Sequence, residues 1–433
     1  MLNFINQFNN KTYLSIFILG LDYIEIVGNK MVTKVEFLSK KKKGNELSNA
    51  DKKNWVHFRL KAGEKIFTCK KCLTLSTRPR AQFDDDRVCN ACRWAKYKKN
   101  KIDWEKRWGQ LEKLCDQYRC KDGARWDVLV PCSGGKDGSY VAYMLKNKLD
   151  MHPLCITMKP QMQTEIGRKN LESFIESGFD HFLITPNPQI YQKLAKRGLI
   201  EQGRPKMPFV TGISLLIINF AMRFNIPFIM YGEEGEEEYG GSTSQVGKYQ
   251  ITKDYLINYY YSGYNPTEYL DQFSKEELKW WIMPSEEDLN KAGLFLSHWS
   301  HYENWDPYKH YLVAKKYCGF QELPQRSVGT YTNFAQLDDD LQDLHAYLMY
   351  IKFGFGRCWS DACIDIRRGA MDRKQAISLI KAYDGEFPDK LLDKYLDYFK
   401  MNEQEFWDVV DSFRSPDIWR KVNGEWKLKF EIE

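Results

Sequence analysis

The sequence predicts an α/β fold in which a parallel sheet carries helices on both faces. Three observations support this prediction. Short apolar segments alternate with helical ones from about residue 127 to residue 234, as in parallel strands covered by helices. Two CxxC pairs precede this region, and after about Tyr239 strand signals are few while helical signals are common. We therefore expect a cysteine module before the sheet and a mostly helical region after it.

Spacing of apolar residues places the individual elements and divides the chain into four regions. Strands are expected over 127–132, 153–158, 181–185 and 227–234, and helices over 104–119, 139–149, 166–177, 189–197, 209–224, 337–352, 373–382 and 388–401. The regions are an N-terminal extension with a small strand pair (1–60), a cysteine module with a linker helix (61–120), a nucleotide-binding domain (121–245) and a helical, substrate-binding region (246–433).

Composition narrows the class of protein. The 433 residues are 43% hydrophobic and 15% aromatic, enough for two or three domains with cores. The net charge of +6 is a mild excess that favours solvated basic faces over nucleic-acid binding. Eleven cysteines, four of them in CxxC pairs, favour metal binding in a reducing compartment, so we expect a cytoplasmic protein. The apolar stretch at residues 13–21 is too short to span a bilayer and lacks the flanks of a signal peptide, so no membrane insertion is expected.

The two CxxC pairs predict a metal site. Cys69 and Cys72 are separated by sixteen residues from Cys89 and Cys92. Two such pairs complete a tetrahedral set of four thiolates, the ligands of structural zinc. Four thiolates leave no position for water, so we expect the zinc to stabilise the module rather than to catalyse.

A glycine-rich loop follows the first predicted strand. It reads Ser133-Gly134-Gly135-Lys136-Asp137-Gly138-Ser139. Backbone N–H groups at the glycines and the N-terminus of the following helix can bind phosphate, Lys136 adds a positive charge, and Asp137 can hold Mg²⁺. The order of residues differs from the GxxxxGK[ST] loop of ordinary nucleotide-binding proteins. All seven residues are candidates for ATP binding, and Lys136 and Asp137 are also candidate catalytic residues.

Two further clusters are candidates for the site. Five glutamates lie in the stretch Met230 to Gly241, and we favour Glu233 and Glu234 as a catalytic pair because they lie nearest the strand end; a solvated acidic loop is the alternative. In the stretch 352–373, the arginines 357, 367 and 368 can receive a carboxylate or phosphates, with Asp361 holding one of them; surface ion pairs are the alternative. The aromatic run 298–308 fits a buried core better than contact with a sugar.

The Ser133–Ser139 loop resembles the PP-loop of ATP pyrophosphatases, in which the β and γ phosphates leave as pyrophosphate and the substrate becomes adenylated. The common form is SGGxDS, and Gly138 is an insertion relative to it. Together with the CxxC pairs, "YGEEGEEEYGG", "LSHWSHYENWD" and "KFGFGR", the loop makes the chain similar to the N-acetyl sugar amidotransferase family of bacterial surface-glycan pathways, over about residues 67–388.

This resemblance implies the conversion of an acetamido group on a sugar to an acetamidino group. The reaction would consume ATP and ammonia, require Mg²⁺ and release AMP and pyrophosphate. The sugar is expected to be nucleotide-linked. A tRNA-thiolating enzyme is the competing enzyme class, but it needs a reactive cysteine pair or an iron–sulfur cluster, and Cys132 and Cys155 stand at buried strand positions. A zinc-ribbon interaction protein with a loop that has lost its activity is the non-enzymatic alternative.

The source of ammonia is not apparent in the chain. A glutaminase needs an activated nucleophile, and no cysteine here stands at the N-terminus or in a Gly-x-Cys-x-Gly turn. We therefore expect a separate glutaminase subunit, for which the resemblance implies the class I type with a cyclase-like subunit that relays ammonia.

Overall fold

The computed structural model describes residues 24–26, 31–33, 56–243, 246–261 and 270–433. Its centre is a five-stranded sheet in which every strand pair is parallel. The spatial order is β5-β4-β3-β6-β7, with bounds β3 (Val128–Pro131), β4 (Pro153–Met158), β5 (Asp180–Ile184), β6 (Phe228–Tyr231) and β7 (Phe295–His298). The chain builds outward from β3 in one direction and then returns to add β6 on the other side. Ligands of such sheets bind at this reversal, beyond the carboxyl ends of β3 and β6.

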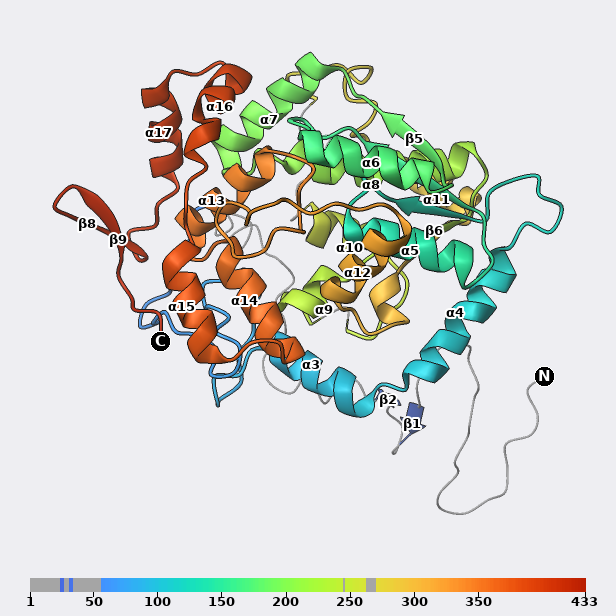
Figure 1. The fold of residues 1–433 in the computed structure, drawn as a ribbon, viewed down its shortest axis with the longest axis horizontal. Helices are drawn as coiled ribbons and strands as arrows, with labels where there is room; N and C mark the ends of the chain where they lie inside the picture. Colours follow the sequence, from blue (N-terminus) through green and yellow to red (C-terminus); the bar gives the residue numbers. More distant parts are fainter. Residues whose placement is uncertain (1–23, 27–30, 34–55, 244–245, 262–269) are drawn as a thin grey trace.

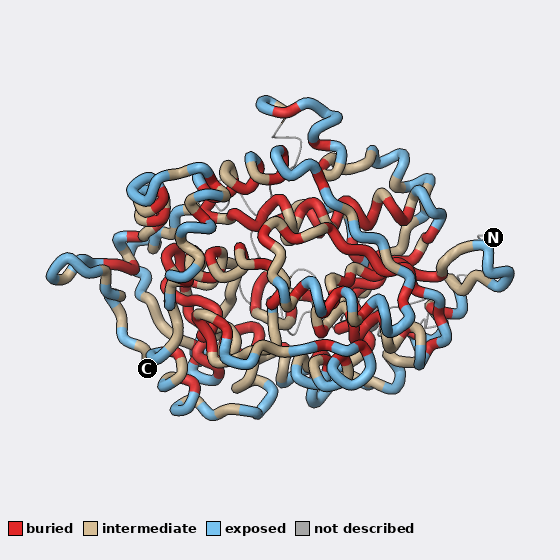
Figure 2. The backbone as a smooth tube through the Cα atoms, turned by 45° about the horizontal axis from the view of Figure 1, so that its top comes forward, coloured by how far each residue is buried: buried red, intermediate tan, exposed pale blue. Residues whose placement is uncertain are grey.

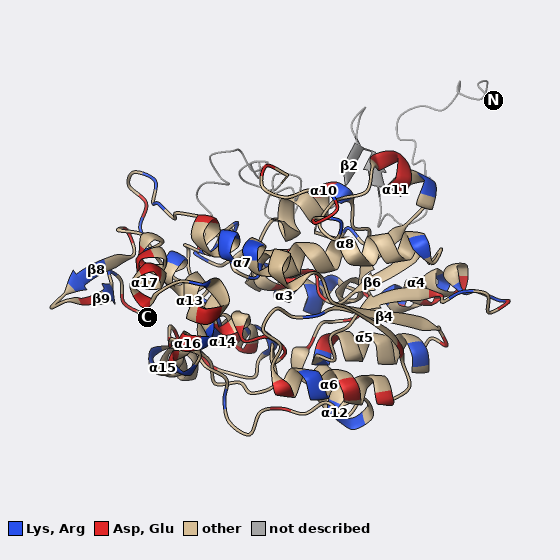
Figure 3. Ribbon diagram, turned by 90° about the horizontal axis from the view of Figure 1, so that it is seen from above, with Lys and Arg blue, Asp and Glu red and all other residues tan. Residues whose placement is uncertain are grey.

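Helices cover both faces of the sheet, as the sequence predicts. Residues of β3 alternate between the two faces: Val128 and Val130 pack with one set of helices and Leu129 with the other. The first set is α4 (Trp104–Tyr118), α5 (Lys136–Asn147), α6 (Glu165–Glu176) and α12 (Pro307–Tyr317); the second is α7 (Pro188–Gln202), α8 (Met207–Arg223) and the π-helical turn η1 (Leu256–Tyr260). Figure 3 shows α8 on one side of the sheet and α5, α6 and α12 on the other.

The remaining elements lie outside the sheet layers (Figure 1). Near the N-terminus, β1 pairs antiparallel with β2, as the expected strand pair does. The bounds are β1 (Ile24–Ile26), β2 (Met31–Thr33), α3 (Asn90–Lys101), α9 (Gly235–Tyr239), α10 (Lys253–Tyr255), α11 (Glu286–Ala292), η3 (Trp299–His301), α13 (Leu341–Phe353), α14 (Arg357–Arg368), α15 (Arg373–Tyr383), η4 (Asp389–Leu391), α16 (Leu392–Phe399), α17 (Glu403–Ser412), β8 (Trp419–Val422) and β9 (Glu425–Leu428).

Two features of the sheet region differ from the sequence prediction. The fifth strand, β7, lies beyond the expected boundary at residue 245. It was missed because Phe295–His298 is only four residues long and ends in Ser-His, and its burial comes from pairing with β6 rather than from local pattern. Helix α5 begins at Lys136, three residues before the expected start at Ser139, so Lys136 and Asp137 belong to its first turn.

The cysteine module packs on the C-terminal helices rather than standing apart. Residues of the module, including Cys69, Cys72 and Leu73, share one core with α14 and α15. The indole Nε1 of Trp359 donates to the carbonyl of Leu73 at 2.8 Å, and Arg373 donates to the carbonyl of Cys69 at 2.7 Å. In Figure 2 buried segments run through the sheet layers and through the C-terminal helices. The cysteine module and helices α14 and α15 thus form one packed unit.

None of the helices in the described ranges has the length and apolar character needed to cross a membrane. The apolar stretch 13–21 lies outside those ranges.

Candidate active site

The glycine-rich loop sits at the reversal point of the sheet. It connects the end of β3 at Pro131 to the start of α5 at Lys136, and Gly135 at the N-cap gives α5 no side-chain cap. The free N–H groups of the first helical turn therefore remain available to an anion.

Two glycines of the loop are required by close packing. A Cβ on Gly134, whose φ is +80°, would lie 2.5 Å from the backbone nitrogen of Leu171 in α6. A Cβ on Gly138 would lie 2.9 Å from the carbonyl oxygen of Pro131. The Gly138 insertion thus lets α5 pack directly on the end of β3.

Lys136 and Asp137 form the charged centre of the loop. The Lys136 ammonium contacts the Asp137 carboxylate, whose other oxygen, Oδ1, lies 2.9 Å from Nδ1 of His310. Burial alone would raise the pKa of Asp137, but Lys136 and His310 together lower it to about 2. The carboxylate is therefore ionised at neutral pH, as a ligand for Mg²⁺ must be.

His310 is a site residue that the sequence analysis missed. It comes from α12, is 1% exposed, stacks on Tyr140 with ring centroids 4.1 Å apart, and meets the edge of Trp305. Its Nε2 atom has no hydrogen-bond partner in the described part of the chain. Burial lowers the pKa of His310, so the neutral ring orients Asp137. The sequence places His310 one turn after the N-cap Asp306 of a helix. That position alone does not indicate a contact with Asp137, which is 173 residues away.

A cleft of about 640 Å³ opens beside the loop. Its size suits a nucleotide together with a second small molecule. The loop contributes Ser133, Gly135, Lys136, Asp137 and Gly138, and the facing walls come from residues 331–338, α13 and α14. The predicted loop and the predicted arginines thus line one cleft.

We expected the Ser139 hydroxyl to contact ATP, but the structure contradicts this expectation. Ser139 is fully buried and does not line the cleft; its Oγ lies 3.8 Å from Sγ of Cys132. Because α5 begins at Lys136, Ser139 is turned toward β3 instead of toward the cleft. Gly134 does not line the cleft either, since it contacts α6.

The two glutamates predicted as a pair have different environments. Glu233 lines the cleft, accepts a hydrogen bond from Tyr239 Oη at 3.2 Å, and has a pKa raised by burial and by Asp137. Glu234 instead caps α9 by accepting from the Glu237 backbone N–H at 2.5 Å, and it receives a second hydrogen bond from Tyr255. Glu234 therefore stabilises the start of α9, and of the expected pair only Glu233 lines the cleft.

Two other glutamates of this stretch connect the sheet domain to the cysteine module. Glu236 pairs with Arg80, and Glu238 pairs with Lys98 at 2.6 Å and accepts from the Trp94 indole at 3.2 Å. Glu236 and Glu237 are buried, so the alternative of a solvated acidic loop is wrong.

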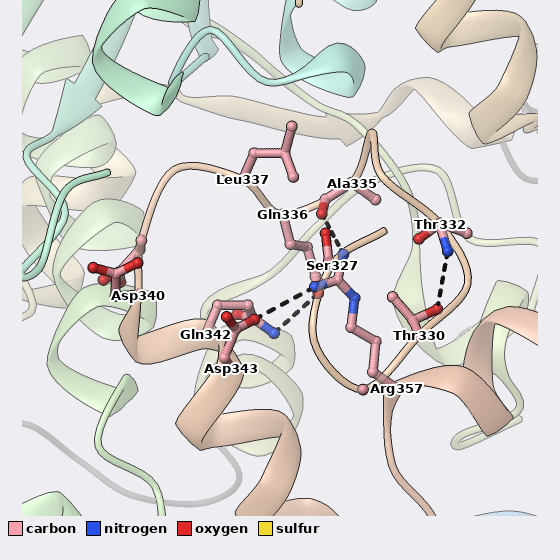
Figure 4. Close-up of polar contacts among 12 residues, drawn as sticks. Ser327, Thr330, Thr332, Ala335, Gln336, Leu337, Asp340, Gln342, Asp343 and Arg357 are labelled. Carbon is pink, nitrogen blue, oxygen red and sulfur yellow. Dashed lines mark hydrogen bonds and ion pairs between the residues drawn. The ribbon is translucent and has the colours of Figure 1, made fainter. Parts of the chain in front are cut away.

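The three predicted arginines all line the cleft but have different partners. Arg357 is 5% exposed, and its guanidinium lies 3.6 Å from Asp343. Figure 4 shows its contacts with the Ala335 carbonyl and with Asp343. Its Nε lies 4.0 Å from Asp361, in line with the expected support. Arg368 pairs with Asp365 at 2.7 Å.

Arg367 serves the cysteine cluster as well as the cleft. It donates through Nη1 to the sulfur of Cys72 at 3.3 Å and through Nη2 to the carbonyl of Glu238 at 3.2 Å. An arginine beside a thiolate offsets the negative charge of a four-thiolate site. Arg367 therefore lies between the cysteine cluster and the cleft.

Most of the aromatic run 298–308 is core, as the sequence indicates. Trp299, Tyr302 and Trp305 are buried, while Tyr308 is 43% exposed, lines the cleft and stacks with the Arg368 guanidinium. Tyr308 is thus the residue of this run that is placed to meet a ligand.

The four predicted cysteines lie together, with ligand atoms all within 4.8 Å of one another. The Cys72–Cys89 and Cys69–Cys92 sulfur separations are 3.5 and 3.9 Å, and tetrahedral zinc with bonds of about 2.3 Å requires roughly 3.8 Å. Backbone N–H groups of Lys71 and Cys92 donate to the cluster's sulfurs, each at 3.4 Å. This donor set fits zinc.

Residues 328–432 match the family model described as "LPS biosynthesis protein WbpG-like, C-terminal domain". The C-terminal region is thus similar to the C-terminal domain of WbpG-like proteins. The matched residues begin just before the cleft wall at 331–338 and include all three predicted arginines. The description of the WbpG-like model names lipopolysaccharide biosynthesis, the same class of pathway as the family that the sequence resembles. No curated protein matches the chain.

Two solved structures are similar to parts of the chain. One is a predicted subunit of tRNA methyltransferase from Methanocaldococcus jannaschii, with 15% identity and a TM-score of 0.27, over 51% of this chain and 86% of that one. The other is NMN synthetase from Francisella tularensis, with 13% identity and a TM-score of 0.25, over 45% of this chain and 94% of that one. TM-scores this low support no inference about function.

Proposed function

We propose that this chain is an ATP-dependent amidotransferase of glycan biosynthesis, which converts the acetamido group of a sugar to an acetamidino group. One observation carries the proposal: the phosphate-binding loop and the wall of the WbpG-like domain line the same cleft. A nucleotide held at Lys136 and a sugar held against residues 331–338 would lie side by side there.

The proposed reaction has two steps. The acetamido oxygen first attacks the α phosphorus of ATP, pyrophosphate leaves, and an adenylated imidate forms. Ammonia then attacks the imidate carbon, the C–O bond breaks, and AMP leaves with the former amide oxygen. Adenylation is needed because an amide oxygen is a poor leaving group. The net products are the acetamidino sugar, AMP and pyrophosphate.

Residues of the cleft match these steps. Lys136 and the N–H groups at the start of α5 would bind the leaving pyrophosphate. Asp137, ionised and oriented by His310, would hold Mg²⁺, which neutralises phosphate charge. Glu233, which lines the cleft and has a raised pKa, would accept a proton from the attacking ammonia.

The thiolation alternative receives less support. Cys132 and Cys155 are fully enclosed between sheet and helices, with 2% and 0% exposure. Cys363 does line the cleft, but a persulfide relay requires a second reactive thiol, and the neighbouring sulfur is that of the zinc ligand Cys72. We therefore retain the amidotransferase.

A glutaminase subunit, with a cyclase-like relay subunit, is the proposed source of ammonia, and the cytoplasm is the proposed compartment because ATP and nucleotide sugars are available there. The chain supplies the synthetase half of such an assembly.

The test is product analysis. The purified chain is incubated with Mg²⁺, ATP, ammonium and nucleotide-linked diacetamido sugars, and mass spectrometry follows the replacement of one oxygen by NH. Formation of AMP and pyrophosphate together with the amidine supports the proposal. Formation of ADP, or of AMP without any change in the sugar, contradicts it.

A further inference from the structure

A half-buried arginine of the cysteine module, Arg78, lines the cleft and has no ion-pair partner in the described ranges. It lies between the two CxxC pairs and lines the cleft beside Thr74, Cys363 and Arg367. In the described ranges the guanidinium of Arg78 makes no ion pair and no hydrogen bond. It forms a cation–π contact with Phe355, in which Cζ lies 5.4 Å from the ring centroid. The sequence analysis did not select it.

The surrounding structure fixes the position of Arg78. The adjacent Thr77 hydroxyl donates to the carbonyl of Phe353 at 2.5 Å, and Arg80 pairs with Glu236. The face of Phe355 attracts the guanidinium charge. Contacts of Thr77 and Arg80 therefore fix the backbone on either side of Arg78. Binding of a ligand then costs less conformational entropy, because this segment is already ordered.

Other cations of the cleft already have acceptors. Lys136 contacts Asp137, Arg368 pairs with Asp365, and Arg357 donates to Ala335. Burial and the nearby charge of Arg367 both lower the pKa of Arg78, although a guanidinium keeps its proton in proteins. A partly buried cation beside a like charge is unfavourable, and an anion that enters the cleft relieves this cost.

The surroundings separate Arg78 from the phosphate loop. Arg78 lies over the ring of Phe355, just before α14, whereas Lys136 and Asp137 belong to the first turn of α5. ATP phosphates at Lys136 would thus occupy a different part of the cleft.

We propose that Arg78 binds an anionic group of the sugar substrate, a phosphate or a carboxylate, and that the zinc module is therefore part of the substrate site. This inference rests on the proposed function, because it assumes that the second ligand of the cleft is a sugar. It adds to the proposed function a residue, Arg78, that recognises the charged group of the sugar substrate.

The test measures binding by calorimetry with three probes: UDP-N-acetylglucosamine carries phosphates, N-acetylneuraminic acid carries a carboxylate, and N-acetylglucosamine is neutral. At least one anionic probe should bind the wild-type chain about tenfold or more tightly than the neutral probe. Arg78→Gln should remove that advantage, since a bidentate contact to a charged group contributes a factor of about ten or more. Arg78→Lys should retain part of it.

Arg87→Gln is the matched control, because Arg87 is an exposed arginine of the same module. It should bind all three probes as the wild type does. Zinc content is measured for every variant. If Arg78→Gln has lost zinc, the inference is judged from the affinity of Arg78→Lys for the anionic and neutral probes. The preferred anionic probe shows whether phosphate or carboxylate is recognised.

ATP binding separates the two proposals. Failure of the wild-type chain to bind ATP would overturn the proposed function. If ATP binds, the inference about Arg78 is overturned by any of three results: no preference for an anionic probe, a preference that survives in Arg78→Gln, or a loss of ATP affinity in Arg78→Gln that equals the loss of probe affinity.

Discussion

Nδ1 of His310 lies 2.9 Å from Oδ1 of Asp137, although 173 residues separate them. The imidazole is buried between Tyr140 and Trp305, so the direction of this hydrogen bond is fixed by packing. The carboxylate proposed to hold Mg²⁺ is thereby oriented before a ligand arrives.

Replacing His310 tests this orientation. His310→Leu should weaken the apparent Mg²⁺ affinity and lower kcat by about tenfold to a hundredfold, because Asp137 loses its donor. His310→Asn, whose amide can donate from nearly the same place, should recover most of both. Mg²⁺ titrations of AMP formation give the result. Equal activity in the Leu variant and the wild type would rule out the positioning role.

Lys136 and Asp137 should each be essential for product formation. Lys136→Met removes the charge that faces the leaving pyrophosphate, and Asp137→Asn removes a metal ligand. Each should lower kcat by about a thousandfold or more, in the range of lost transition-state electrostatics, while the melting temperature changes by only a few degrees. Chromatography of adenine nucleotides should show AMP in the wild type and neither AMP nor ADP in the variants. Substantial AMP release by Lys136→Met would show that pyrophosphate departs without it.

Zinc removal should destabilise the C-terminal helices as well as the module, because the cysteines share a core with α14 and α15. We expect about one zinc per wild-type chain and substantially less in Cys89→Ser, with a lower melting temperature. Cys115→Ser, which removes a buried thiol of α4 outside this core, is the control and should keep its metal. Atomic absorption and thermal melts give the answer, and undiminished zinc in Cys89→Ser would refute the ligand assignment.

The raised pKa of Glu237 predicts that the free energy of unfolding depends on pH. Burial raises the pKa of Glu237 from 4.5 to about 8 in the folded chain. Between these two values the folded state keeps a proton that the unfolded state has lost, so this group's contribution to stability falls as the pH rises. Glu237→Gln keeps an acceptor for the Gly247 N–H and cannot ionise.

The stabilising effect of Glu237→Gln should therefore grow from pH 5.5 to pH 8, by roughly 1–4 kcal/mol. Denaturant unfolding at the two pH values measures it, with Glu287→Gln at an exposed position of α11 as the control. A Glu237→Gln effect that is the same at both pH values would show that Glu237 is ionised in the folded chain.

The source of ammonia gives a further prediction. The chain alone should use concentrated ammonium salts, and more efficiently at alkaline pH, because only unprotonated ammonia has a lone pair for attack. Glutamine should support almost no turnover until a glutaminase partner is added. Comparable rates with glutamine and ammonia for the chain alone would show that one of its cysteines is a nucleophile.

Local pattern was sufficient for the elements that carry their own signals. Four of the five strands, the loop and the four cysteines were predicted because apolar runs, glycines and CxxC spacing are local features. Strand β7 was not, since it is short and owes its burial to β6.

The misassigned site residues share one cause. Glu233 and Glu234 are adjacent in sequence, and only the tertiary fold turns the first to the cleft and the second to Tyr255. His310 and Arg78 were missed for the same reason, because each becomes a site residue through contacts with distant elements.

The hydrogen bond from Trp359 to Leu73 joins residues 286 positions apart. Contacts of such high sequence separation form late, since a long loop must close before they can stabilise the chain. During synthesis on the ribosome the cysteine module would emerge early and wait, with apolar side chains such as Leu73 uncovered, until α14 and α15 follow it. A chain truncated before residue 357 would retain the sheet but leave that surface permanently exposed to aggregation.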